Sequence, residues 1–420
     1  MSYGTELPQD LVLNILYRLP AKSLCRFKCV SKSWLTLISY PHFAKTHLNR
    51  SNSKTERAIL ISDDLYSVDC AEAFNNDDLI ATKLDLFSIE KQYEFEILGS
   101  CNGLILVRDA NCTKFLLNPS TREIRELLDS PFAPAHAMNG LGYDSSADDF
   151  RIVAIDVRSD PDPDAAVVDV EDDESCCTYT IASLYSLKTD SWRRIQDVLN
   201  YHYRSRITTV SMVLVNESLH WLIFGSYGDR FVIAAFDLAD EKFHDVQRPS
   251  SLVNNNVHFT YILGVCRGCL CIFVCGYSFQ IEVWVMKEYG VTESWTKHTR
   301  YIGNMYMEQP LYFLVDEEVL MRKDRDELFA FNAEEKTSRE IVVRGIPAMF
   351  RGGMTYVESL VSPYHAHGID GVRESLVEDY RAWRGQSMAQ AKAKAKAKRY
   401  TLDMGSSSRS IEASQFPFYR

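Results

Sequence analysis

The sequence predicts a chain that is α+β by segments: a small N-terminal unit of three helices, a large all-β domain, and a disordered C-terminal tail. Three observations predict this class. Apolar residues recur at helical spacing within residues 7–38. Beyond them, short runs rich in Val, Ile, Leu, Phe and Tyr alternate with Asn, Asp, Gly and Ser, which is typical of many short strands. The end of the chain is rich in Ala, Lys and Ser, a composition that does not build a core.

The first helix is predicted to start at Pro8 and to end at Pro20. Proline suits the first turn of a helix, because the N–H that it lacks has no partner inside the helix there. Between the two prolines, one apolar stripe follows helical spacing and is formed by Leu11, Ile15, Leu16 and Leu19.

Two further helices are expected before Pro41, which is taken to close the unit. The second fits residues 21–29, and Ser31 is the expected N-cap of a third that carries Trp34, Leu37 and Ile38. A unit of about 40 residues is at the lower limit of what folds alone. Its apolar surface is therefore expected to lie in the groove of a partner protein.

The same segment resembles the F-box motif in its plant form. The positions that carry the resemblance are Leu7, Pro8, Ile15, Leu16, Arg18, Leu19, Pro20, Lys22, Ser23, Leu24, Arg26, Lys28, Val30, Ser31, Lys32, Trp34, Leu37 and Ile38. The resemblance implies that residues 1–48 bind a Skp1-type adaptor and, through it, the cullin and RING subunits of a ubiquitin ligase. The alternative is an ordinary helical cap packed on its own domain.

The expected adaptor-binding residues are Leu7, Pro8, Leu11, Ile15, Leu16, Leu19, Pro20, Leu24, Val30 and Trp34. Which of them face the adaptor and which face the core of the unit is left open by the sequence.

Composition limits the class of protein further. The chain has 420 residues and a net charge of −11, which disfavours a general nucleic-acid surface. No apolar run is long enough for a membrane span, and the N-terminus has no signal-peptide pattern, so a cytoplasmic or nuclear location is expected. The eleven cysteines are odd in number and fit free thiols better than a disulfide framework.

A repeat runs through the β region. Its core is an apolar strand that ends in an aromatic residue or Leu, followed by a polar turn and a second strand. The corresponding positions are 118, 186, 237, 285 and 332, which lie 68, 51, 48 and 47 residues apart. The first interval contains an acidic stretch at residues 158–175, and it shortens to 50 without that stretch. A period near 50 is the kelch-type signature of propeller blades.

A second repeated motif supports this interpretation, because the stretch at 99–106 matches the one at 264–271. Together the repeats predict five blades. A sixth is expected from strands at both ends of the region, near residues 57–62, 82–87 and 354–362, which would close the ring at about six blades. Residues 55–363 resemble the F-box-associated, kelch-like domain of plant F-box proteins, although only Gly352-Gly353 provides the double glycine of true kelch repeats.

Other motifs have less specific interpretations. Cys266, Cys269, Cys271 and Cys275 could suggest zinc, but the repeat aligns Cys269 and Cys271 with Leu104 and Leu106, so structural thiols and no metal are expected. The eight carboxylates between residues 160 and 174 are expected to form a solvated insertion. In residues 364–420, a short helix over 371–386 and a basic, Ser-rich tail are expected.

The sequence therefore predicts a substrate-recognition subunit of a Skp1–cullin–F-box ubiquitin ligase, with no cofactor and no catalytic residues. The helical unit would bind the adaptor, and the propeller would bind a protein target whose identity and contact residues are unknown. The resemblance is closest to plant F-box proteins that restrain pathogen responses, and pollen self-incompatibility F-box proteins share the architecture. The alternatives are a propeller enzyme of oxidase or hydrolase type and a scaffold that delivers no target.

Overall fold

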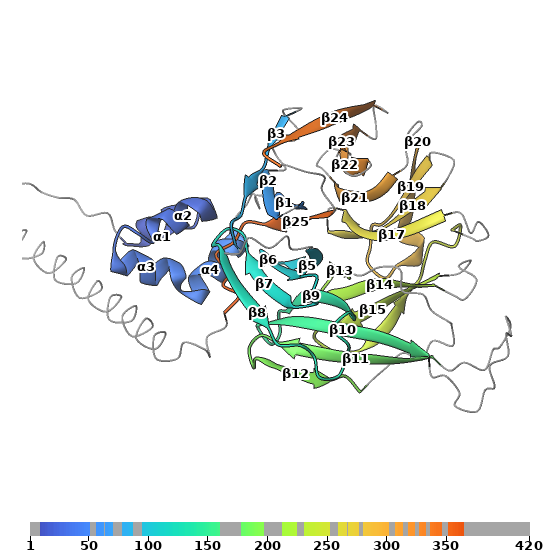
Figure 1. Ribbon diagram of the computed structural model, residues 1–420, viewed down its shortest axis with the longest axis horizontal. Coiled ribbons are helices and arrows are strands. Elements are labelled where there is room, and N and C mark those ends of the chain that lie inside the picture. The colour runs from blue at the N-terminus through green and yellow to red at the C-terminus, as the bar shows by residue number, and fades with distance from the viewer. Residues whose placement is uncertain are drawn as a thin grey trace, which may run out of the picture.

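The structure is a computed structural model in which a small group of helices lies beside a large β domain (Figure 1). It describes residues 9–50, 56–62, 64–69, 78–86, 95–159, 178–196, 212–224, 231–252, 259–266, 268–276, 280–301, 307–313, 318–323, 327–332, 337–346 and 352–364. Several sequence predictions fall outside these ranges, namely those on Leu7, Pro8, most of the acidic stretch, the helix over 371–386 and the basic tail.

Four helices open the described chain, one more than the sequence predicts. They are α1 (Gln9–Leu16), α2 (Ala21–Phe27), α3 (Lys32–Ser39) and α4 (Pro41–Arg50). Ser31 caps α3 as predicted, because its hydroxyl oxygen accepts a hydrogen bond from the Trp34 backbone N–H at 3.2 Å. The prediction that Pro41 closes the unit is wrong. Pro41 is the first residue of α4, where proline forfeits no helical hydrogen bond.

The four helices share a core. Leu16 of α1, Leu24 of α2 and Ile38 of α3 are at most 1% exposed. The fourth helix contributes Phe43, whose ring stacks on Tyr17 with the ring centroids 4.8 Å apart. The unit is thus better packed than three short helices alone would be, because α4 covers apolar surface that three helices would leave exposed.

Five sheets are built from consecutive segments of the chain, and sequential strands pair antiparallel within each. The first three are β5 (Glu96–Cys101), β6 (Leu104–Arg108), β7 (Lys114–Asn118), β8 (Glu123–Leu127); β9 (Met138–Asp144), β10 (Asp149–Ser159), β11 (Thr178–Ser186), β12 (Ser191–Arg194); and β13 (Val213–Val215), β14 (Ser218–Phe224), β15 (Phe231–Asp237), β16 (Phe243–Val246).

The fourth and fifth sheets follow the same plan. Their strands are β17 (Phe259–Cys266), β18 (Cys269–Gly276), β19 (Gln280–Met286), β20 (Trp295–Tyr301), preceded by the short 3-10 helix η1 (Thr292–Ser294); and β21 (Met307–Phe313), β22 (Glu318–Lys323), β23 (Glu327–Asn332), β24 (Thr337–Arg344). This repetition of four-stranded antiparallel sheets around a ring is a β-propeller.

The repeat near 50 residues marks the ends of the third strands, which confirms that prediction. Asn118, Ser186, Asp237 and Asn332 end β7, β11, β15 and β23, and Val285 lies one residue before the end of β19. At Asn118, Ser186 and Asp237, the polar side chain accepts hydrogen bonds from the backbone of the turn that follows. The Asn118 and Asp237 side-chain oxygens accept backbone N–H bonds from the residue two positions later, at 2.8 and 2.9 Å.

Strands from the two ends of the repeat region complete the ring, as the sequence predicts. β25 (Gly352–Val357) pairs antiparallel with β1 (Glu56–Ile61), which pairs with β2 (Leu65–Asp69). The stretch expected at 82–87 contributes only the short outer strand β4 (Thr82–Lys83). The preceding strand, β3 (Asp78–Ile80), instead pairs in parallel with β24 of the neighbouring sheet. One short segment therefore connects the outer edges of two sheets.

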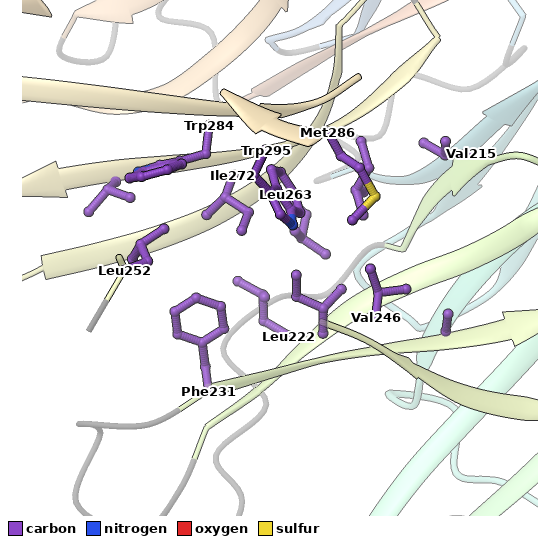
Figure 2. Close-up of a cluster of buried hydrophobic side chains, with 14 residues drawn as sticks. Val215, Leu222, Phe231, Val246, Leu252, Leu263, Ile272, Trp284, Met286 and Trp295 are labelled. Carbon is purple, nitrogen blue, oxygen red and sulfur yellow. The ribbon is translucent and has the colours of Figure 1, made fainter. Parts of the chain in front are cut away.

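Neighbouring sheets pack face to face through large apolar side chains. Figure 2 shows the interface between the sheets of β13–β16 and β17–β20, where Leu222 and Phe231 lie opposite Ile272 and Trp284. Trp295 joins the same cluster, and its indole N–H donates to the Gln247 carbonyl oxygen at 2.9 Å. Such interfaces between sheets form the apolar core of the β domain.

We expect ring closure to be needed for solubility. A chain truncated after residue 351 loses β25 and leaves β1 with an unpaired edge, which should make the protein associate through that edge. A chain truncated after residue 364 retains every described strand and serves as the control. Size-exclusion chromatography and thermal melting compare the two. A soluble monomer with unchanged melting temperature for the shorter chain would contradict the role of β25.

Candidate protein-interaction surface

The helix α1 is apolar on two sides. Leu16 lies in the core at 1% exposure, whereas Leu11 and Ile15 are each 50% exposed. Leu11 and Ile15 are four residues apart, so they lie on the same helical face. The helical core is already filled without them, and this face is therefore available to another protein.

Two further apolar side chains are exposed near the start of α3. Val30 is 64% exposed and Leu35 is 44% exposed. Sequence analysis missed Leu35, although its position holds a signal: Leu35 lies off the stripe of Trp34, Leu37 and Ile38 in the same helix. The helical unit, including the α2–α3 turn with Val30, holds four of the ten exposed large apolar side chains in the described residues, a concentration that is typical of an interaction surface.

The structure divides the predicted adaptor-binding residues into groups. Leu11, Ile15, Pro20 and Val30 are exposed, whereas Leu19 and Trp34 are half-buried. The Trp34 ring packs edge-on against Phe27, with the centroids 5.5 Å apart. Leu16 and Leu24 lie in the core, so they shape the surface from beneath. This is the division between surface and core that the sequence left open.

The helical unit also carries most of its charge with one sign. Residues 9–50 contain seven Lys or Arg side chains and one acidic side chain, in a chain whose net charge is −11. Arg18, Lys22, Arg26 and Lys32 are exposed. A surface that combines apolar and basic side chains favours an acidic protein partner.

Another side of the helical unit contacts the propeller. Lys45 of α4 forms an ion pair with Asp148, in the β9–β10 turn, at 3.0 Å, and its ammonium lies over the ring of Tyr143. The Tyr143 hydroxyl donates to the Asp148 carboxylate, and this bond, followed by that from Lys45, lowers the pKa of Asp148. Both partners of the ion pair are largely exposed, so the pair sets orientation more than stability.

The helices cover part of one face of the propeller. Cys25 of α2 contacts the carbonyl oxygen of Ser120 in the β7–β8 turn, with a sulfur–oxygen distance of 3.6 Å, and burial raises the pKa of the Cys25 thiol. Turns after the first and third strands of a sheet therefore face the helices here. The β8 strand ends, and β9 begins, at the opposite end of these antiparallel ladders, on the other face of the ring.

One connection on that other face is described in full, the segment 128–137 between β8 and β9. Leu128 and Phe132 are 68% and 38% exposed. The backbone of the segment is nevertheless held firmly, because the Arg108 guanidinium donates to the carbonyl oxygens of Ala135 and Ala137 at 3.2 and 3.1 Å. The Trp192 indole N–H donates to the Leu128 carbonyl oxygen at 2.7 Å. A firmly held segment with apolar side chains exposed is suited to protein contact.

The cysteine motif occupies the β17–β18 hairpin. In the ladder between β17 and β18, Cys266 lies opposite Cys269, and Gly264 lies opposite Cys271. The β5–β6 hairpin has the same register, with Cys101 opposite Leu104 and Gly99 opposite Leu106. The predicted equivalence is confirmed. Cys271 is fully buried, and burial raises the pKa of its thiol. Among the described residues, no group of three or more His, Cys, Asp or Glu side chains is arranged to hold a metal ion.

A buried histidine is relevant to the alternative hypothesis that the propeller is an enzyme. His220 is 0% exposed, its Nδ1 lies 3.2 Å from the Val213 carbonyl oxygen, and its Nε2 lies 2.8 Å from the Tyr289 hydroxyl. Both ring nitrogens are therefore engaged by the protein itself. Burial lowers the pKa of His220 to about 4. This histidine is part of the fold, with no ring nitrogen left for a substrate.

Comparison with known proteins agrees with this arrangement. Residues 5–46 match the F-box domain, and residues 56–363 match the F-box associated beta propeller domain. The chain therefore belongs to the F-box proteins that carry an F-box-associated β-propeller. The matched range of 56–363 begins at β1 and includes β25, and these are the two strands that close the ring.

Two curated relatives from Arabidopsis thaliana span most of the chain. F-box protein CPR1 is 30% identical over 84% of this chain and 88% of its own length. F-box/kelch-repeat protein At3g23880 is 26% identical over 85% of this chain and 96% of its own length. These matches support a substrate-adaptor role in a Skp1–cullin–F-box ligase. In addition, none of the helices in the described ranges is long and apolar enough to cross a membrane.

We expect His220 to make the protein less stable in mild acid. Its pKa is about 4 when folded and near 6.5 when unfolded, so the unfolded chain takes up a proton between these values that the folded chain does not. Stability from this group is complete above the unfolded pKa and falls by up to about 1.4 kcal/mol per pH unit as the pH drops toward the folded pKa.

Denaturant unfolding at about pH 7 and about pH 5 measures this effect. His220→Gln should reduce the loss between the two conditions, whereas His244→Gln, which changes the neighbouring half-buried histidine, should retain it. An unchanged pH dependence in His220→Gln would contradict the assignment.

Proposed function

We propose that this protein is the substrate-recognition subunit of a Skp1–cullin–F-box ubiquitin ligase. The observation that carries the proposal is the apolar and basic surface of the four helices, whose exposed apolar side chains lie outside the packed core of the unit. The matches to the F-box and its associated propeller support the same assignment.

The helices bind the Skp1-type adaptor through Leu11, Ile15, Val30 and Leu35. Burial of a large apolar side chain contributes roughly 1.5–3 kcal/mol when it is complete. Because each of the four side chains is only about half exposed, each can contribute about half of this value when the adaptor covers it. The exposed basic residues accelerate the encounter with an acidic adaptor, and this part of the interaction should weaken as salt is raised.

The propeller binds the target protein on the face opposite the helices. That face presents the segment 128–137, with Leu128 and Phe132 exposed. Because the two partners bind on opposite sides of the propeller, the protein can hold the adaptor and the target at the same time. The protein contributes proximity: a target held near an activated ubiquitin reacts as if the transfer were intramolecular.

The chain performs no bond-making of its own in this proposal, and its target is marked for proteasomal degradation. The resemblance to F-box proteins that restrain pathogen responses supports a role in plant immune regulation, in the cytoplasm or the nucleus. A non-degradative scaffold would bind the same adaptor without changing the lifetime of any target. Target half-life with and without a proteasome inhibitor separates these two functions.

Replacing an exposed apolar residue of the helices by aspartate should abolish adaptor binding while preserving the fold. We expect Ile15→Asp, and separately Val30→Asp, to weaken binding to purified Skp1-type adaptor by at least about tenfold, or about 1.4 kcal/mol. Because both side chains are half or more exposed, the unfolding free energy should change by only about 0.5 kcal/mol. Isothermal titration calorimetry and thermal melting measure the two effects.

Leu128→Asp is the matched control. It introduces the same charge at an exposed apolar residue, 68% accessible, on the face of the ring away from the helices. It should bind the adaptor like the unmodified protein but lose captured target. The adaptor assignment is wrong if all three variants bind the adaptor equally well.

A further inference from the structure

The core of the helical unit contains a residue from the C-terminal end of the propeller domain. After β25 ends at Val357, residues 358–364, here called the C-terminal clamp, run along the face of the ring that carries the helices. Leu360 of this clamp is 4% exposed and packs in the same apolar cluster as Leu16, Leu24 and Ile38. The F-box domain match covers residues 5–46, so Leu360 lies more than 300 residues beyond it.

Asn118 holds the clamp to the ring. Its side-chain amide donates to the carbonyl oxygens of Ser359 and Val361 at 3.1 and 2.6 Å, on either side of Leu360. Its side-chain oxygen accepts the Ser120 backbone N–H at 2.8 Å, which fixes the β7–β8 turn. Asn118 is 0% exposed, so these bonds form away from competing water.

The same turn contacts both the clamp and the helices. The Ser359 backbone N–H donates to the Ser120 hydroxyl oxygen at 3.4 Å, while the Ser120 carbonyl oxygen contacts the Cys25 sulfur of α2. Further along, the Tyr364 hydroxyl donates to the Ile124 carbonyl oxygen at 2.5 Å. The clamp is therefore fastened along its length, and Leu360 is presented to the helices from a fixed position.

Gly103 leaves the space in which the clamp lies. It sits in the β5–β6 turn at a φ of +86°, and a Cβ atom there would lie 2.1 Å from the Ser359 hydroxyl oxygen and 2.7 Å from the Val357 carbonyl oxygen. Gly268 is its counterpart in the β17–β18 hairpin. It has a similar φ of +78°, but a Cβ atom there would meet nothing within 4 Å. Turn geometry accounts for both glycines, and only Gly103 is also required by a neighbouring segment.

We propose that the C-terminal clamp is a positioning element of the F-box: Leu360, held by Asn118 and admitted by Gly103, completes the helical core and sets the adaptor-binding surface. Ring closure and adaptor binding are thereby coupled, because β25 delivers the clamp. This inference rests on the proposed adaptor-binding function, and it adds residues of the propeller to those on which that function depends.

A pair of glycine variants tests the proposal in the full-length protein. Gly103→Ala and Gly268→Ala share the cost of alanine at positive φ, but only the first displaces the clamp. We expect Gly103→Ala to weaken binding of the purified Skp1-type adaptor by about tenfold and Gly268→Ala to leave it unchanged. Hydrogen exchange should show faster exchange in the amides of α1–α3 for Gly103→Ala only.

Leucine variants provide the second, independent comparison. Leu360→Ala should reduce adaptor affinity and helix protection, and Leu360→Met should restore both, because methionine fills a similar volume. Leu238→Ala removes an equally buried leucine between two propeller sheets and should lower the melting temperature without changing adaptor affinity.

The outcomes separate the two hypotheses. If the unmodified protein binds no adaptor, the proposed function fails, while the hydrogen-exchange comparison still tests whether the clamp supports the helices. If the unmodified protein binds the adaptor, and both Gly103→Ala and Leu360→Ala bind it equally well with normal helix protection, the clamp has no positioning role.

Discussion

The antiparallel pairing of β1 with β25 decides where the other parts of the molecule lie. It joins the two ends of the repeat region in one sheet, so the ring has no open edge at that point. The same pairing places the chain that enters β1 and the chain that leaves β25 on one face. The helices precede β1 and the clamp follows β25, so both arrive on the side where they can share a core. Without this pairing, Leu360 would have no route to the helices.

This arrangement places the two proposed binding surfaces on opposite faces of the propeller. The helices cover one face through the β7–β8 and β9–β10 turns, where Cys25 and Lys45 make their contacts. The segment 128–137, which connects β8 to β9, lies on the opposite face. A receptor that must hold an adaptor and a target at once gains from such a division, because the sites cannot compete. A rigid attachment between them also limits where a bound target can be placed.

The polar residues of the interior serve the fold. Asn118 caps a turn with its oxygen and holds the clamp with its amide, and His220 has both ring nitrogens engaged. Asp237 caps its turn in the same way as Asn118. These groups are the kind that often indicate catalysis when they are buried together. Here each of them has protein partners that account for its position.

Much of this could be predicted from sequence because it depends on local patterns. The helical stripe, the Ser31 cap and the recurrence of polar residues at the ends of third strands follow from periodicity and turn chemistry, which act over a few residues. The equivalence of Cys269 and Cys271 with Leu104 and Leu106 came from the repeat in the same way. These patterns were sufficient to predict the propeller and the family, and also the closure of the ring by strands from both ends.

The remaining features were decided by tertiary structure, because they depend on residues distant in the chain. Leu11 and Leu16 look alike in sequence, and only the packing of α2, α3 and α4 makes one of them surface and the other core. Pro41 fits the end of one unit as well as the start of a helix, and in the folded protein it starts α4, whose Phe43 packs in the helical core. Gly103 signals a turn by itself, but its contact with Ser359 exists only when β25 has closed the ring. The sequence by itself thus determined the elements and their repeat, whereas the folded ring determined which residues form the surface and which hold it in place.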